Sequence, residues 1–122
     1  MAKRILIIED DTDILELLIY IFEEEGYHVS SFTKSLEAEQ IVLLSPDVVL
    51  MDINLSGSPK RGDEICSDLR KFEFSRQIPV LLLSAEKNLA SLALNCQADE
   101  YMTKPFDIDK LIENVENMQN VP

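Results

Sequence analysis

The sequence predicts an α/β fold in which a parallel sheet of five strands is covered by helices on both faces. Short aliphatic runs alternate along the chain with longer stretches whose apolar residues recur at helical spacing. The aliphatic runs are apolar at nearly every position, as expected for strands buried on both faces. Alternation of this kind indicates successive strand–helix units, which place their strands parallel in one sheet.

Five runs of β-branched and aliphatic residues predict the strands. The first, "KRILIIE", and the third, "DVVLMDI", are strongly apolar, and the fourth, "IPVLLLS", stays apolar until its final serine. The second and the fifth are shorter. The predicted strands cover residues 3–9, 27–32, 47–53, 78–84 and 99–103.

The stretches after the strands predict helices because apolar residues recur every three or four positions. Gly26 ends the first helix, Pro46 closes the second, and Asp107 caps the last. We expect helices from Ile14 to Gly26, at 35–44, 63–72 and 86–96, and from Asp107 onward. The expected inward faces are Ile14, Leu17, Leu18, Ile21 and Phe22 in the first helix, Ile65 and Leu69 in the third, and Ile108, Leu111, Ile112, Val115 and Met118 in the last.

Length and charge limit the classes of protein to consider. With 122 residues, of which 46% are hydrophobic, the chain is long enough for one domain with a core and too short for two. Its 23 acidic and 11 basic residues give a formal charge of −12. Because a phosphate backbone would repel so acidic a domain, we expect no direct nucleic-acid binding.

Neither a membrane segment nor a disulfide framework is indicated. No apolar stretch approaches the ~20 residues that span a bilayer, and the first residues, "MAKRILIIED", do not resemble a signal peptide. The two cysteines, Cys66 and Cys96, fit neither a disulfide framework nor a metal knuckle. We therefore expect free thiols and a cytoplasmic protein without membrane association.

Polar residues gather where the predicted strands end. Because the carboxyl ends of parallel strands meet at one edge of a sheet, where ligands bind in such folds, these side chains should converge. The group contains carboxylates, one hydroxyl and one ammonium, and its members are Glu9, Asp10, Asp11, Asp52, Ser84 and Lys104.

The adjacent carboxylates of this group need a compensating charge. Like charges held close together repel, and a carboxylate beside an apolar core resists ionisation. A divalent cation would offset both effects, and Mg²⁺ prefers oxygen ligands. The sequence thus predicts a metal site at Glu9, Asp10 and Asp52. Without the cation these groups should titrate as a coupled set, with at least one carboxyl partly protonated.

Four segments strongly resemble the receiver domain of two-component response regulators: "ILIIEDDTDI", "VVLMDINLSG", "LLLSAE" and "DEYMTKPFDIDKL". The ordered set of acidic pair, central aspartate, serine and Lys-Pro is more specific than any of its parts, and the resemblance covers essentially the whole chain. It implies a flavodoxin-like sheet with strand order 2-1-3-4-5. We expect one receiver domain over residues 1–122 and no output domain.

The resemblance implies a phosphoacceptor and a set of metal ligands. Asp52 resembles the phosphoacceptor, which also binds the metal, Asp10 resembles the direct metal ligand, and Glu9 resembles the acidic residue that acts through water. Asn54 would offer its backbone carbonyl to the metal. The implied cofactor is Mg²⁺, for which Mn²⁺ could substitute. Asp11 falls one position beyond the acidic pair, so we expect it to be solvated near the start of the first helix.

The remaining polar residues resemble phosphoryl-binding and switch positions. Ser84 resembles the hydroxyl that hydrogen-bonds the phosphoryl group, and Lys104 resembles the lysine that pairs with it. A cis peptide before Pro105 would help to aim this lysine. Tyr101 matches the aromatic switch position, and it would turn into the space that Ser84 leaves on moving toward the phosphoryl group.

The function that the resemblance implies is signalling by phosphoryl transfer. The domain would take a phosphoryl group from a histidine kinase or phosphotransfer protein onto Asp52 and switch a partner-binding surface. Its downstream partner would be an effector protein or a missing output domain, and it would be a monomer or a phosphorylation-dependent homodimer. We expect no enzymatic activity beyond its own phosphotransfer and dephosphorylation.

The segment after the predicted acceptor departs from the usual receiver pattern. In "NLSGSPKRGDE", Ser56 stands where proline is usual and Gly62 comes late, so the loop 54–62 is lengthened. The stretch from Ser84 to Tyr101 is short, which predicts a shortened or shifted fourth helix. These departures concern partner contacts and dephosphorylation rate more than the phosphorylation site.

Three other functions are left open by the sequence. A degenerate receiver would bind partners without being phosphorylated. A phosphohydrolase of the haloacid dehalogenase type also uses a strand-end aspartate with Mg²⁺, but it needs a second aspartate where this chain has Asn54. A flavodoxin-like carrier of FMN needs a phosphate-binding loop after the first strand, where "EDDTDI" offers carboxylates. The degenerate receiver is therefore the leading alternative.

Overall fold

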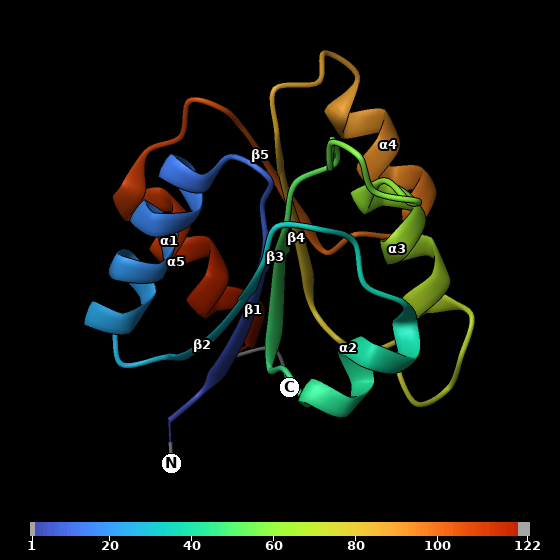
Figure 1. Cartoon of the computed structure of the whole chain (residues 1–122), viewed down its shortest axis with the longest axis horizontal. Coiled ribbons are helices and arrows are strands. Elements are labelled where there is room, and N and C mark those ends of the chain that lie inside the picture. The colour runs from blue at the N-terminus through green and yellow to red at the C-terminus, as the bar shows by residue number, and fades with distance from the viewer. Residues whose placement is uncertain (1, 120–122) are drawn as a thin grey trace.

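The computed structural model describes residues 2–119 and contains one parallel sheet of five strands (Figure 1). The strand order is β2-β1-β3-β4-β5, and every neighbouring pair is parallel. The predicted fold class and strand order are thus confirmed. The strands are β1 (Arg4–Ile8), β2 (His28–Phe32), β3 (Val48–Met51), β4 (Val80–Ser84) and β5 (Glu100–Thr103).

Helices cover both faces of the sheet, with α1 and α5 on one face and α2, α3 and α4 on the other (Figure 1). All five predicted helices are present, but α2 and α4 begin later than predicted, because the residues before them belong to the connections that follow β2 and β4. The fourth helix has 8 residues, and its shortening or shift relative to other receivers stays a prediction. The helices are α1 (Thr12–Glu24), α2 (Ala38–Leu44), α3 (Gly62–Arg70), α4 (Leu89–Cys96) and α5 (Ile108–Gln119).

The sheet separates two apolar cores because alternate strand residues face its two sides. On one face, Ile7 of β1 belongs to a core with Phe22 of α1 and Leu111 of α5. On the other face, Ile8 belongs to a core with Ile65 of α3. Each fully buried aliphatic or aromatic side chain contributes about 1.5–3 kcal/mol. The central strands therefore form a well-packed support for the residues at their ends.

Two residues predicted to face inward are exposed. Leu17 of α1 and Ile108 of α5 each expose 43% of their surface. In α1 the buried face includes Leu15 and Leu18, and Leu17 lies about 100° around the helix axis from Leu18. Ile108 is the first residue of α5 and precedes its first buried residue, Leu111, by nearly one turn. The helical spacing of the apolar residues was predicted correctly, but the burial of Leu17 and Ile108, at the edge of the apolar face, was not.

Both cysteines have the state predicted for them. Cys66 and Cys96 are buried and are free thiols, as predicted. The Cys66 thiol donates a hydrogen bond of 3.4 Å to the carbonyl oxygen of Cys96. Within residues 2–119, the helices lack the length and apolar composition that crossing a membrane requires.

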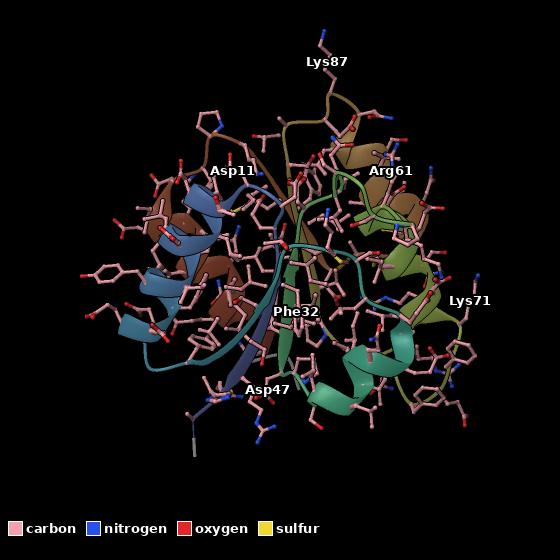
Figure 2. All side chains as sticks on the ribbon, viewed as in Figure 1. Asp11, Phe32, Asp47, Arg61, Lys71 and Lys87 are labelled. Atoms are coloured by element: carbon pink, nitrogen blue, oxygen red, sulfur yellow. The ribbon has the colours of Figure 1, made fainter. Side chains whose placement is uncertain are left out.

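Parallel pairing brings the carboxyl ends of the strands to one edge of the sheet. Ile8 of β1 lies opposite Met51 of β3 in the register. Glu9 and Asp52 follow these two residues, so both acidic residues leave adjacent strands at the same level. Asp47, which precedes β3, lies at the other edge (Figure 2). The carboxyl edge is therefore the place where the predicted site is assembled.

Candidate functional site

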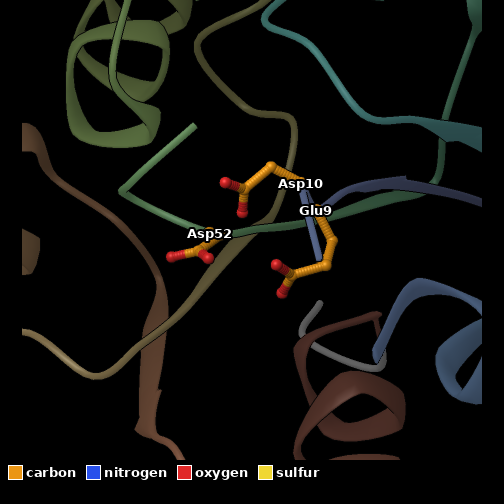
Figure 3. A group of neighbouring side chains, drawn as sticks. All are labelled: Glu9, Asp10 and Asp52. Carbon is orange, nitrogen blue, oxygen red and sulfur yellow. The ribbon is translucent and has the colours of Figure 1, made fainter. Parts of the chain in front are cut away.

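Three carboxylates meet at the carboxyl edge of the sheet (Figure 3). Glu9, Asp10 and Asp52 each place one carboxylate oxygen so that the three oxygens lie within 4.8 Å of one another. Glu9 and Asp52 are buried, with 1% and 6% of their surface exposed, and Asp10 is half-buried. The predicted convergence of these side chains is confirmed, and their spacing suits a cation bound between them.

Lys104 reaches this acidic cluster from the end of β5. Its Nζ lies 2.7 Å from Glu9 Oε1 and donates a hydrogen bond of 2.9 Å to Asp52 Oδ2. The Lys104 amide donates to the carbonyl oxygen of Ser84 at 3.0 Å, and the peptide bond from Lys104 to Pro105 is cis, as predicted. One ammonium group therefore contacts two of the three carboxylates.

Glu9 is the carboxylate whose charge is hardest to maintain. Burial raises the pKa of Glu9 from 4.5 to about 7. The charge of Asp52 also raises this pKa, whereas the Lys104 ammonium and the Asp11 backbone amide lower it. The Asp11 amide donates to Glu9 Oε2 at 3.1 Å. A carboxyl group with a pKa near neutrality keeps part of its protons at neutral pH. This agrees with the predicted coupled set in which one carboxyl stays partly protonated.

Asp10 and Lys104 are both shifted toward their charged forms. Burial alone would raise the pKa of Asp10, but hydrogen bonds outweigh it and lower the pKa; the largest comes from the Ser56 amide to Asp10 Oδ2 at 3.1 Å. Burial alone would lower the pKa of Lys104, but its contacts with Glu9 and Asp52 raise it. The site is therefore negative overall and contains one fixed cation.

Backbone geometry separates Asp11 from the acidic cluster and orients Asp52. Asp52 Oδ1 accepts a hydrogen bond of 3.2 Å from the backbone amide of Asn54. Asp11 is exposed, and its side chain caps α1 by accepting from the amides of Asp13 and Ile14 at 3.0 and 3.2 Å. Asp11 thus lies at the start of the first helix, as the resemblance implied, and it does not join the group that the strand ends alone predicted, because its side chain caps the helix.

Gly62 has a steric role at this site that we did not predict from the sequence. A Cβ atom at Gly62 would lie 2.0 Å from the carbonyl oxygen of Asp52 and 2.9 Å from its carbonyl carbon. The Gly62 amide also donates to the carbonyl oxygen of Ile53 at 2.9 Å. The absence of a side chain lets α3 begin directly against the backbone of Asp52. The available signal was a glycine immediately before a helical pattern.

Glu86 is a second residue whose contacts were not predicted. Its Oε1 accepts a hydrogen bond of 2.7 Å from Asn54 Nδ2, and its amide donates to Ser84 Oγ at 3.2 Å. Ser84 is fully buried at the end of β4, on the predicted edge. Glu86 therefore joins the connections after β3 and β4. A single acidic residue in a polar loop gave no signal of this contact.

Tyr101 lies on β5 with an exposed side chain. It is opposite Leu82 of β4 in the register, and 42% of its surface is exposed. Its switch role stays a prediction. The metal-ligand role of the Asn54 carbonyl also stays a prediction.

The donor set fits a hard divalent cation. When ionised, the three carboxylates of the cluster outweigh the single charge of Lys104, so a divalent ion would neutralise the remainder. All the side-chain donors of the cluster are carboxylate oxygens, which suit Mg²⁺ or Mn²⁺ rather than the ions that prefer thiolate ligands. The predicted Mg²⁺ site is consistent with this chemistry.

The fold and the acidic site at its carboxyl edge are those of the receiver class of signalling domains. The family model described as "Response regulator receiver domain" matches residues 5–116. The chain belongs to this family, and the resemblance found in its sequence is confirmed.

Solved structures of receiver domains are similar over nearly the whole chain. The receiver domain of NtrX from Brucella abortus is 26% identical with a TM-score of 0.81, covering 97% of this chain and 99% of that chain. A longer NtrX chain is 27% identical with a TM-score of 0.79, covering 98% of this chain and 27% of that chain. The receiver domain of a sensor histidine kinase from Pseudomonas aeruginosa is described with a magnesium ion in its active-site cleft. It is 21% identical with a TM-score of 0.83, covering 99% of this chain and 100% of that chain, and this likeness concerns the fold alone.

Proposed function

We propose that this domain accepts a phosphoryl group on Asp52 from a histidine kinase or phosphotransfer protein. The observation that carries the proposal is the environment of Asp52. Its carboxylate lies in a cluster with Glu9 and Asp10, and it accepts a hydrogen bond from Lys104 at 2.9 Å. A nucleophilic carboxylate beside a cation site and a fixed ammonium is the arrangement that phosphoryl transfer needs.

The transfer requires a positioned nucleophile and neutralised phosphoryl oxygens. An Asp52 oxygen forms the new O–P bond as the P–N bond of phosphohistidine breaks, and the bonding electron pair leaves with the ring nitrogen. The backbone amide of Asn54 donates a hydrogen bond of 3.2 Å to Asp52 Oδ1, and this bond orients the carboxylate for attack. Lys104 moves from its carboxylate partners to the incoming phosphoryl oxygens and pairs with them as a point charge.

The acidic residues hold the metal in this proposal. Asp10, Asp52 and the backbone carbonyl of Asn54 would hold Mg²⁺, and Glu9 would act through water; Mn²⁺ could substitute. When bound, the ion neutralises charge on the phosphoryl oxygens and offsets the repulsion among the carboxylates. Support comes from the spacing of the three side chains and from the magnesium ion described in the Pseudomonas aeruginosa receiver domain.

Phosphorylation would switch the surface through Ser84 and Tyr101. The phosphoryl group adds up to about two negative charges and strong hydrogen-bond acceptors. Ser84 would move to donate its hydroxyl to this group, and its oxygen accepts a hydrogen bond of 3.2 Å from the Glu86 backbone amide. The connection that contains Glu86 would shift with it, and the exposed ring of Tyr101 would turn inward.

Partners and setting follow from the same proposal. The domain acts on an effector protein or on an output domain, in line with the match to one part of the longer NtrX chain. It acts in the cytoplasm, as a monomer or a phosphorylation-dependent dimer, and it catalyses only its own phosphotransfer and dephosphorylation. A haloacid dehalogenase mechanism is disfavoured because the Asn54 side chain has no carboxylic proton to donate. That side chain is also hydrogen-bonded to Glu86.

Intact mass spectrometry after incubation with acetyl phosphate and Mg²⁺ tests the proposed function. We expect one phosphoryl adduct on the parent protein and none on Asp52→Asn, which keeps the shape of the side chain and removes the nucleophile. A receiver domain of known activity, treated in parallel, verifies the reagent. An unmodified parent protein would favour the degenerate receiver that binds partners without phosphorylation.

A further inference from the structure

Ser56 is held from two sides by charged residues of different segments. Its amide donates to Asp10 Oδ2 at 3.1 Å, and its carbonyl oxygen accepts a hydrogen bond of 2.9 Å from Lys34 Nζ. Lys34 follows β2, and β2 is paired with β1, which leads to Asp10. The backbone of Ser56 therefore connects a lysine outside the acidic cluster to one of its carboxylates.

The backbone conformation around Ser56 depends on the same lysine contact. Residues 55–58 form a turn in which the Ser58 amide donates to the Leu55 carbonyl oxygen at 3.0 Å and Gly57 has a φ of 71°. A positive φ at the third residue is typical of a type II turn, which differs from type I in the direction of its central carbonyl. That carbonyl belongs to Ser56. Lys34 thus favours the observed turn by binding the carbonyl in this direction.

Further contacts fix the lengthened loop to the segment that follows β2. The Ser35 amide donates to Ser58 Oγ at 3.0 Å. Lys60 Nζ lies 3.1 Å from Glu37 Oε2 and 2.5 Å from Asp68 Oδ2, so it joins the loop to the start of α2 and to α3. The loop is therefore anchored at several points, of which only the Lys34 contact involves the residue that binds Asp10.

We propose that Lys34 is a positioning residue of the metal site. By binding the Ser56 carbonyl, Lys34 keeps the turn where the Ser56 amide orients the Asp10 carboxylate, and it thereby strengthens Mg²⁺ binding. Groups that orient a metal ligand commonly affect metal affinity in this way. The inference rests on the proposed function, since it assigns Asp10 to the metal. The sequence alone gives no sign of this role, since Lys34 is one polar residue after a predicted strand.

The sign of the effect separates positioning from simple electrostatics. A lysine close to a cation site should weaken cation binding by charge repulsion, so removing its charge should strengthen Mg²⁺ binding. Removing a residue that positions Asp10 should do the opposite. The two explanations therefore predict changes in opposite directions for one substitution.

The experiment measures Mg²⁺ affinity by calorimetric titration of the full chain and of Lys34→Met. We expect the dissociation constant to rise about threefold to tenfold, which corresponds to the loss of one hydrogen bond of ordinary net strength. Lys34→Arg keeps a charged donor and should stay close to the parent value. The matched control is Lys87→Met, because Lys87 extends away from the fold and makes no polar contact within residues 2–119 (Figure 2); it should leave the affinity unchanged or slightly stronger.

A second measurement uses the metal-free protein. Hydrogen exchange of the Ser56 amide, followed by NMR, should become faster in Lys34→Met, while the amides of α5 keep their exchange rates. Unchanged or tighter Mg²⁺ binding by Lys34→Met, or unchanged exchange at Ser56, would overturn the inference. If the parent protein itself fails to bind Mg²⁺, the proposed function fails instead, and the exchange rates still report on whether Lys34 holds the turn.

Discussion

Glu9 Oε1 and Lys104 Nζ lie 2.7 Å apart in a partly buried ion pair, and the same ammonium donates to Asp52 at 2.9 Å. Glu9 is 1% exposed, so water contributes little to the stability of its charge. Lys104 is thus a fixed counter-charge beside two buried carboxylates. These contacts tie the charge state of this edge to the stability of the whole domain.

Replacing Lys104 should destabilise the metal-free protein at alkaline pH. Lys104→Met leaves the carboxylates of Glu9 and Asp52 without their cation, and removing one partner of a buried ion pair typically costs about 3–5 kcal/mol. Urea unfolding at about pH 8 with a chelator present measures the loss. Lys110→Met, at an exposed position of α5, should change the free energy of unfolding by less than about 0.5 kcal/mol.

The pH dependence of this loss tests its cause. At about pH 5 Glu9 is mostly protonated, since its pKa is about 7, and the substitution should then cost clearly less. An equal loss at both pH values would mean that Lys104 acts through packing rather than through charge.

Glu9 itself should make the metal-free domain less stable as the pH rises. Burial raises the folded-state pKa of Glu9 from 4.5 to about 7, so the native state binds this proton more tightly than the unfolded chain does. The contribution is fully present below about pH 4.5 and is lost as the pH rises through about 7. Urea unfolding of the parent protein and of Glu9→Gln at several pH values measures it. The parent should lose stability relative to Glu9→Gln across this interval, and parallel curves would contradict the assignment.

The fold could be predicted almost completely from the sequence because its signals are local. Apolar runs buried on both faces, such as the one that contains Ile7, need no knowledge of distant residues to be recognised as strands. Leu17 and Ile108 were placed wrongly because the edge of a helix's apolar face depends on how the helix sits on the sheet. That orientation is set by tertiary packing and leaves no clear local pattern.

The candidate site was predictable only where the residues form an ordered motif. Glu9, Asp10, Asp52 and Lys104 meet as expected, because strand order places the ends of the strands together. The contacts of Lys34 could not be foreseen, since they depend on the backbone path of a lengthened loop. Such contacts are set by the direction of single peptide groups, which the sequence pattern does not encode.

Removing the Asp10 carboxylate should abolish the stabilisation by Mg²⁺. Ligand binding to the native state raises its stability by mass action, so Mg²⁺ should raise the Tm of the parent protein and leave that of Asp10→Ala unchanged. Thermal unfolding with and without Mg²⁺ measures both shifts. Asp11→Ala is the matched control: it should lower stability by about 1 kcal/mol through loss of the α1 cap, yet keep the Mg²⁺-dependent shift. A full shift in Asp10→Ala would show that Asp10 is not a metal ligand.

A methyl group at Gly62 should damage both stability and phosphorylation. In Gly62→Ala, the added Cβ would lie 2.0 Å from the carbonyl oxygen of Asp52, so the start of α3 or the acceptor's backbone must move. We expect the free energy of unfolding to fall by about 2–4 kcal/mol in urea unfolding, comparable to other severe steric changes, and the acetyl-phosphate adduct to appear more slowly.

The comparison is Gly26→Ala, where a Cβ meets nothing within 4 Å and only the positive φ of 90° is strained. That substitution should cost about 1–2 kcal/mol and leave the rate of phosphorylation unchanged, because Gly26 lies far from the carboxyl edge. Equal phosphorylation rates in the two variants would mean that α3 can withdraw without disturbing Asp52.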